Sequence, residues 1–138
     1  MKERGYAVQI FTPFYDENRC FEECKNLDIT VAGSWFPASI FGRFKALCAY
    51  LRMLFCTLYV ILFAGNFTYY MLDQVSFPIP CLRCRNRKVL FYCHYPDKLL
   101  STNRRGCLMR VYRLVLDWVE EKTTGLAMTI LVNSKFTL

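Results

Sequence analysis

The chain has 138 residues, is 54% hydrophobic, and carries 18 Lys and Arg against 11 Asp and Glu, a formal net charge of +7. Such an apolar sequence is not disordered, and its length suits one domain or part of a larger protein. The positive charge favours an anionic partner, such as a membrane surface or a phosphate-bearing substrate. The N-terminus, MKERGYAVQIF, lacks the long apolar core of a cleavable signal. We therefore interpret the eight cysteines as reduced thiols facing the cytosol.

The first third of the chain predicts two short strands. Residues 6–12 (YAVQIFT) are rich in β-formers and end at Pro13, and residues 28–32 (DITVA) form a second strand that stops at Gly33. Residues 1–5 (MKERG) resemble the last turn of a helix closed by glycine. We therefore expect the chain to start within a βαβ unit.

Residues 46–64 form an apolar run of nineteen residues, interrupted only by Arg52, which is long enough to span a bilayer as a helix. Two interpretations stay open. A spanning helix would hold Arg52 in its outer third, where the side chain reaches the interface. A helix packed on a sheet or lying in the interface would keep Arg43, Lys45 and Arg52 on its wetter side. Strands predicted on both sides of the run favour the second interpretation, and Arg52 is a candidate membrane contact.

The second half of the chain predicts three strands and a helix. Residues 67–73, 89–92 and 128–132 have strand composition, and residues 77–80 form a rigid, proline-containing connection. A helix runs from the candidate caps at 101–103 to Gly125. Its apolar residues fall on one face: Leu108, Val111, Tyr112, Val115 and Val119. Strands alternating with helical or long connections predict an α/β fold with a doubly wound, Rossmann-like parallel sheet.

The central stretch of the chain is KVLFYCHYPD, residues 88–97. Its apolar run is typical of a strand covered on both faces, and Pro96 ends that strand. His94, the single histidine of the chain, therefore follows the carboxyl end of a buried strand, where open α/β sheets bind ligands. The structural alternative is a buried imidazole bonded to a backbone carbonyl. Position alone does not decide between the two.

Two groups of basic residues flank this strand. Arg83, Arg85, Arg87 and Lys88 precede it, at the opposite end of the sheet from His94, and we expect them to contact anionic lipid. Nucleic acid is a less suitable partner, because the aromatic residues lie in apolar strands. Lys98, Arg104 and Arg105 lie where the following helix begins, and their charge opposes its dipole. An anionic ligand held there would compensate, the alternative being solvated arginines.

Cys81-x-x-Cys84 has the spacing of a metal-ligand pair, with Cys93 and His94 downstream. Adjacent Cys93 and His94 are poorly placed to share one tetrahedron with that pair. We expect no metal ion and no cofactor, and we retain a small zinc module as an alternative.

Three stretches together, KVLFYCHYPDKLL, RVYRLVLDWVEEKTTGLA and TILVNSKFT, resemble the N-terminal domain of a glycosyltransferase family. The family comprises the alpha-1,3/1,6-mannosyltransferases of asparagine-linked glycosylation, and the similarity extends back to GYAVQIFT. The resemblance implies the incomplete N-terminal half of a two-domain GT-B enzyme, retaining and metal-independent. It implies transfer of mannose from GDP-mannose to a dolichol-linked oligosaccharide, on the cytosolic face of the endoplasmic reticulum membrane.

In the family the N-terminal domain handles the acceptor, and a histidine in the position of His94 lies near the reacting sugars. The family begins with a strand and a glycine-rich loop and ends with a donor-binding domain, neither of which is found in this sequence. We therefore expect residues 1–138 to be a partial acceptor-side domain that is inactive alone. The remaining alternative is a non-catalytic, single-pass membrane protein anchored by residues 46–64.

Overall fold

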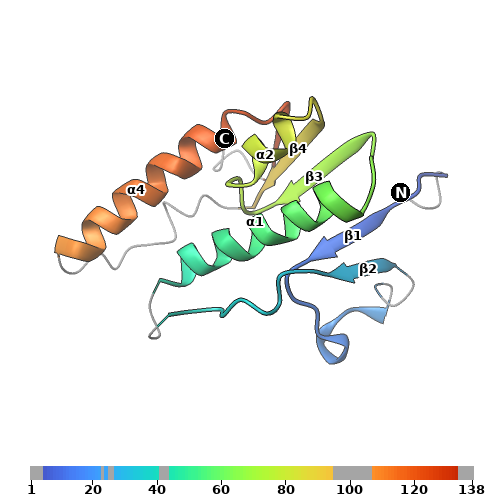
Figure 1. Cartoon of the computed structure of the whole chain (residues 1–138), viewed down its shortest axis with the longest axis horizontal. Coiled ribbons are helices and arrows are strands. Elements are labelled where there is room, and N and C mark those ends of the chain that lie inside the picture. Colours follow the sequence, from blue (N-terminus) through green and yellow to red (C-terminus); the bar gives the residue numbers. More distant parts are fainter. Residues whose placement is uncertain (1–4, 23, 25–26, 41–43, 95–106, 134–138) are drawn as a thin grey trace. The chain divides into compact units, whose positions relative to one another are not determined.

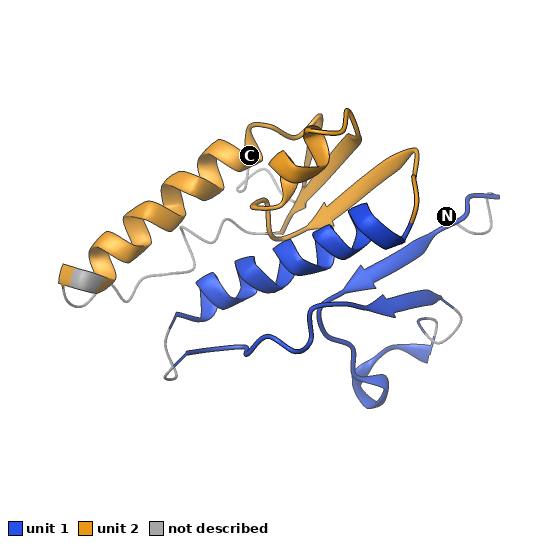
Figure 2. Cartoon of the chain, viewed as in Figure 1, with its two compact units in different colours: residues 1–64 blue, residues 65–138 orange. Residues whose placement is uncertain are grey.

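A computed structural model describes residues 5–22, 24, 27–40, 44–94 and 107–133. Strands and helices follow one another along the chain (Figure 1). The chain divides into two compact units, Met1–Ala64 and Gly65–Leu138 (Figure 2). Every strand pairing in the two sheets that the described residues form is parallel. The predicted α/β class with Rossmann-like parallel strands is therefore confirmed.

The first unit contains a two-stranded sheet. Strand β1 (Gln9–Thr12) pairs in parallel with β2 (Asp28–Val31), so that Gln9 lies opposite Asp28. The strand predicted at residues 6–12 thus begins three residues later. A short 3-10 helix, η2 (Glu17–Arg19), lies in the connection between the strands. Its first turn is capped by the Asp16 carboxylate, which accepts a hydrogen bond from the Asn18 amide at 3.0 Å.

Helix α1 (Lys45–Phe63) confirms the long apolar helix and packs against other parts of its own unit. The chain passes close to it at Gly33, where an added Cβ would lie 3.0 Å from the Arg52 carbonyl oxygen. The φ angle of Gly33 is +90°, a conformation suited to glycine. Beside this crossing the Phe55 ring contacts the Trp35 ring, with centroids 4.8 Å apart. One side of α1 is therefore covered by protein.

The second unit contains a three-stranded sheet in the order β3-β4-β5. Its strands are β3 (Tyr69–Asp73), β4 (Lys88–Cys93) and β5 (Thr129–Val132). Along β4 the buried positions alternate with more exposed ones, because successive side chains point to opposite faces. Val89 and Phe91 are almost fully buried and form the core with Leu72 and Leu116. The strand predicted to be central is central to this sheet.

A short helix, α2 (Ile79–Arg83), replaces part of the rigid connection predicted at residues 77–80. Pro80 lies in its first turn, where the amide hydrogen that proline lacks would have no partner within the helix. Ile79 and Leu82 are buried, so this single turn contributes apolar area to the core. The prolines start a helix here instead of preventing one.

Helix α4 (Cys107–Thr124) matches the predicted helix but turns a different face to the core. Val111 and Val115 are 54% and 56% exposed, whereas Leu116 and Asp117 are buried. The rotation is fixed from its C-terminal end, where the Thr123 hydroxyl and the buried Ser76 hydroxyl are hydrogen-bonded at 2.8 Å. Val111 and Val115, two residues of the predicted apolar face, are therefore exposed to solvent instead of packed in the core.

Candidate functional site

His94 directly follows β4, and Asp73 is the last residue of β3. The two strands are neighbours in parallel register, with Asp73 opposite Tyr92. His94 is two residues beyond Tyr92, so their side chains share one face of the sheet. Sheet geometry therefore brings Asp73 and His94 together at the carboxyl edge.

The two side chains form an ion-pair geometry at this edge. His94 Nε2 lies 3.2 Å from Asp73 Oδ1, and the two side chains are 51% and 65% exposed. The Tyr92 ring meets the imidazole edge to face, with centroids 4.5 Å apart, and limits its rotation. The structural alternative of a buried imidazole is wrong, because His94 is exposed and faces a carboxylate.

The end of β3 is held in place by a tight turn. The Gln74 amide donates to the Tyr92 carbonyl at 3.0 Å, which extends the ladder by one residue past Asp73. Gln74 then adopts a φ of +65°, uncommon for a residue with a side chain. Two residues later, Ser76 is buried against α4. Asp73 is thus fixed from both sides.

Cys93 lies beside His94 on the opposite face of β4 and is buried. Burial, and secondarily the negative charge of Glu120, raise the pKa of the Cys93 thiol above its usual value. A thiol in these surroundings has little nucleophilic character. Cys93 therefore belongs to the core, and the polar chemistry of this edge lies with Asp73 and His94.

The predicted basic run lies at the opposite, amino edge of the same sheet, as expected. Arg83, Arg85 and Lys88 are exposed, whereas Arg87 is only 8% exposed. Its guanidinium donates to the Tyr70 hydroxyl and to Asn66 Oδ1. Lipid contact by this run stays a prediction, and Arg87 is the one buried member of the four.

The structure treats the three remaining sets of predicted residues differently. Arg52 is a candidate membrane contact. Its Nη2 donates a hydrogen bond to the Pro13 carbonyl at 2.9 Å, so its guanidinium is bonded within the first unit. The candidate anion-binding residues Lys98, Arg104 and Arg105 lie outside the described residues. Cys81 and Cys84 are both free thiols, and within the described ranges no third His, Cys or acidic side chain groups with them to hold a metal ion.

Asp73 is the site residue that the sequence analysis missed. The signal was available, since Asp73 ends one predicted parallel strand just as His94 ends the next. To use this signal one must know that β3 pairs with β4, and the sequence alone does not determine strand pairing.

Comparison with known proteins identifies relatives along almost the whole chain. The chain is 48% identical to the alpha-1,3/1,6-mannosyltransferase ALG2 of Homo sapiens, over 99% of its own length and 34% of that protein. It is 46% identical to the enzyme of the same name from Mus musculus, with the same two coverages. The corresponding protein of Dictyostelium discoideum is 47% identical over 94% of the chain and 32% of its own length.

The chain thus spans about a third of the length of the curated relatives it matches. No protein-family model matches the chain, and no solved structure matches it significantly. The predicted resemblance to alpha-1,3/1,6-mannosyltransferases is confirmed at the level of sequence.

Proposed function

We propose that this chain forms the acceptor-side part of an alpha-1,3/1,6-mannosyltransferase. It is homologous to about a third of the length of each such enzyme that it matches. The observation that carries the proposal is the identity of 48% over 99% of the chain. A polar pair, Asp73 and His94, at the carboxyl edge of a parallel sheet supports it, because this edge is where α/β sheets hold ligands.

His94 would contact the reacting sugars, and Asp73 would orient it. An Nε2–H group that donates to the Asp73 carboxylate leaves Nδ1 unprotonated in the neutral imidazole. That nitrogen can accept a hydrogen bond from a sugar hydroxyl. The bond strengthens as positive charge develops at the anomeric carbon, which lowers the barrier to transfer.

The substrates follow from the family resemblance. Mannose would come from GDP-mannose, with retention of configuration, and the acceptor would be dolichol-diphosphate-linked mannosyl-chitobiose. The enzyme would act at the cytosolic face of the endoplasmic reticulum membrane. Helix α1 supports membrane association, since among the described residues it is the one helix long and apolar enough to cross a bilayer. Exposed Leu62 and Phe63 at its end provide apolar surface for lipid.

A chimaera tests the proposal. The matching third of the Homo sapiens relative is replaced by this chain, and mannosyl transfer from GDP-mannose to the dolichol-linked acceptor is measured. We expect transfer in the chimaera, and a loss of turnover on the order of a hundredfold or more in its His94→Ala variant. Acceptor affinity and melting temperature should change much less.

Asp28→Asn, at an exposed position of β2, is the matched control and should transfer mannose normally. A folded chimaera without transfer would contradict the proposed function. Normal turnover of His94→Ala with a lowered melting temperature would show instead that His94 is a structural residue.

A further inference from the structure

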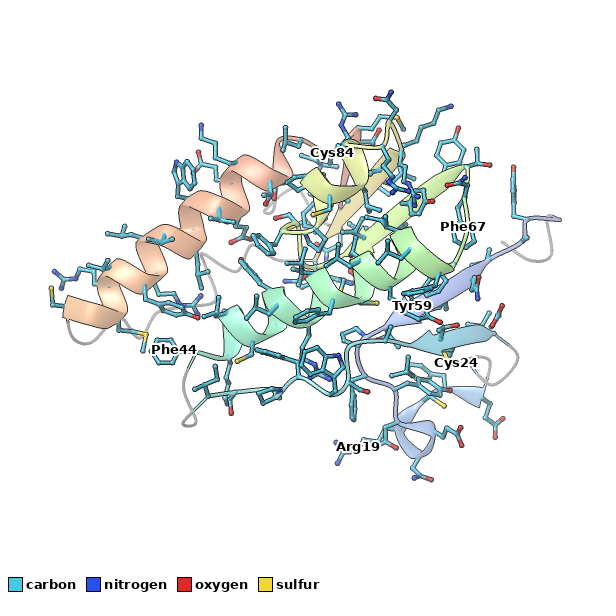
Figure 3. The ribbon with its side chains drawn as sticks, in the orientation of Figure 1. Arg19, Cys24, Phe44, Tyr59, Phe67 and Cys84 are labelled. Carbon is cyan, nitrogen blue, oxygen red and sulfur yellow. The ribbon has the colours of Figure 1, made fainter. Side chains whose placement is uncertain are left out.

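A cavity of about 370 Å³ opens at the amino edge of the three-stranded sheet, the end opposite His94. It is formed by the turn that enters β3 and the turn that leads from α2 into β4. Figure 3 labels Phe67 on the first turn, and Cys84, at the end of α2, marks the start of the second. The cavity is shallow and open to solvent.

Arg87 is the buried cation of this cavity. It lines the cavity and is only 8% exposed, and its guanidinium lies over the Tyr70 ring, 4.7 Å from the centroid. Its two hydrogen-bond acceptors, the Tyr70 hydroxyl and Asn66 Oδ1, are both neutral. Within the described part of the chain, Arg87 has no carboxylate partner. The side chain is thus held in a fixed position without a counter-charge.

Such an arrangement is costly without an anion. Removing a cation from water carries a penalty that neutral hydrogen bonds offset only in part. A guanidinium also has five N–H donors in a planar fork, and the two bonds to Tyr70 and Asn66 use two of them. The remaining donors fit an oxyanion with several acceptor oxygens.

The rest of the lining has the same sign. Arg85 and Lys88 also line the cavity, and no acidic residue is among its lining residues. Both side chains are exposed, and the Lys88 ammonium lies over the Tyr69 ring, 5.3 Å from its centroid. Asn86, between the two arginines, adopts a φ of +54°, which turns the chain sharply between exposed Arg85 and buried Arg87. Three cations therefore surround one polar cavity.

We propose that this cavity binds a phosphate-bearing ligand, with Arg87 as the fixed anchor and Arg85 and Lys88 closing on the phosphate from the rim. The site is separate from the Asp73–His94 edge and does not depend on mannosyl transfer. A free phosphate compound and a phosphomonoester lipid headgroup present the same chemistry to these side chains. The oxygens of either accept the charged hydrogen bonds that Arg87 lacks in the described structure.

Binding of inorganic phosphate to the purified chain tests the site. Titration calorimetry at constant ionic strength should detect binding, and the Arg85→Gln/Lys88→Gln double variant should weaken it by at least about tenfold. Arg83→Gln is the matched control, because Arg83 is an exposed arginine at the end of α2, next to this turn, and does not line the cavity. It should change the affinity by less than about twofold.

Arg87→Lys keeps the charge but cannot bridge Tyr70 and Asn66, so it should weaken phosphate binding as well. If Arg87→Lys does not fold, the Arg85→Gln/Lys88→Gln variant still tests the site. Both of its positions are exposed, so the substitutions should not disturb folding. A vesicle assay distinguishes a lipid headgroup from a free phosphate compound as the ligand. It compares binding to phosphatidylcholine vesicles that contain either phosphatidic acid or phosphatidylserine, matched for surface charge. Stronger binding to phosphatidic acid that depends on Arg85 and Lys88 assigns the site to a lipid headgroup.

Phosphate binding without a preference between the two vesicles assigns it to a free phosphate compound. The proposal is overturned if calorimetry detects no binding of phosphate and the chain binds vesicles with phosphatidic acid no more strongly than vesicles with phosphatidylserine. It is also overturned if Arg83→Gln weakens binding as much as the double variant, since diffuse attraction to a basic surface would then account for the result.

Discussion

The contact between His94 and Asp73 arises from two strand ends, and each side chain is half or more exposed. An exposed pair of this kind contributes little to stability. Its effect is on orientation, because a carboxylate beside Nε2 favours the tautomer that carries its proton there. The single histidine makes this effect measurable without interference from other imidazoles.

We expect the neutral imidazole of His94 to favour the Nε2–H tautomer, and Asp73→Ala to shift that preference by about twofold toward Nδ1–H. Long-range proton–nitrogen NMR correlation on the labelled chain, at alkaline pH, measures the tautomer ratio. Asp28→Ala, in the other unit, should leave the ratio unchanged. A ratio unaffected by Asp73→Ala would remove Asp73 from the account of the site.

Single residues were predictable where one strand determines their place. His94 was placed correctly because a buried apolar run ending before a proline defines a strand end by itself. Asp73 and the burial of Arg87 were not predicted, because both depend on a neighbouring strand. Tyr70 supplies the ring and hydroxyl that bury Arg87, and it is 17 residues away in the sequence.

Among the elements, α4 illustrates what periodicity omits. The apolar stripe of this helix was identified correctly, but periodicity does not say which face the rest of the chain covers. Hydrogen bonds at its C-terminal end orient the helix. The Ser76 hydroxyl lies 3.3 Å from the Glu120 carbonyl and 2.8 Å from the Thr123 hydroxyl, and Ser76 is 2% exposed.

Ser76→Ala should therefore lower the free energy of unfolding by about 1 kcal/mol. The cost stays moderate because the Thr123 hydroxyl keeps a second acceptor, the Val119 carbonyl at 2.8 Å. Urea denaturation followed by circular dichroism measures the difference, with the exposed Ser34→Ala as the control. An unchanged midpoint for Ser76→Ala would show that this contact does not hold α4.

Helix α1 combines a covered side with an exposed apolar side. Phe55 packs on Trp35 and Phe36, while Leu62 and Phe63 are 65% and 74% exposed. Packing within the first unit favours the packed or interfacial interpretation of this segment. The exposed residues still provide apolar area for insertion into the headgroup region.

Expressed in cells, the chain should therefore sediment with membranes, and high salt should release it only in part. Salt screens attraction between basic residues and lipid, whereas apolar insertion is insensitive to it. Immunoblotting of salt-washed and detergent-extracted fractions measures the two components. Leu62→Ser/Phe63→Ser should increase the salt-released share. Full recovery in a low-salt soluble fraction would rule out membrane binding.

At the scale of the whole molecule, the fold class and each of the five strands in the described part of the chain were predictable from composition and turn residues. The division into a two-stranded and a three-stranded sheet was not, because alternation of elements defines the class and leaves strand pairing undetermined. The family resemblance supplied the proposed reaction, which composition alone did not.

The isolated chain should not bind GDP-mannose in the micromolar range or transfer mannose. The resemblance assigns the groups that hold the donor diphosphate to another domain, and the chain matches about a third of its relatives. Calorimetric titration with GDP-mannose tests this. The Arg85→Gln/Lys88→Gln variant controls for weak occupancy of the basic cavity by the diphosphate. Micromolar binding that persists in this variant would contradict the prediction.

The two compact units each contain one of the two tryptophans of the chain. Trp35 is in the first unit, against Phe55, and Trp118 is on α4 of the second. Each unit thus has its own intrinsic fluorophore. Replacing either indole with phenylalanine leaves a chain whose emission reports on one unit alone. Superimposable denaturation curves from the two single-tryptophan chains would mean that the units unfold as one cooperative system, and separated curves would assign each unit a stability of its own.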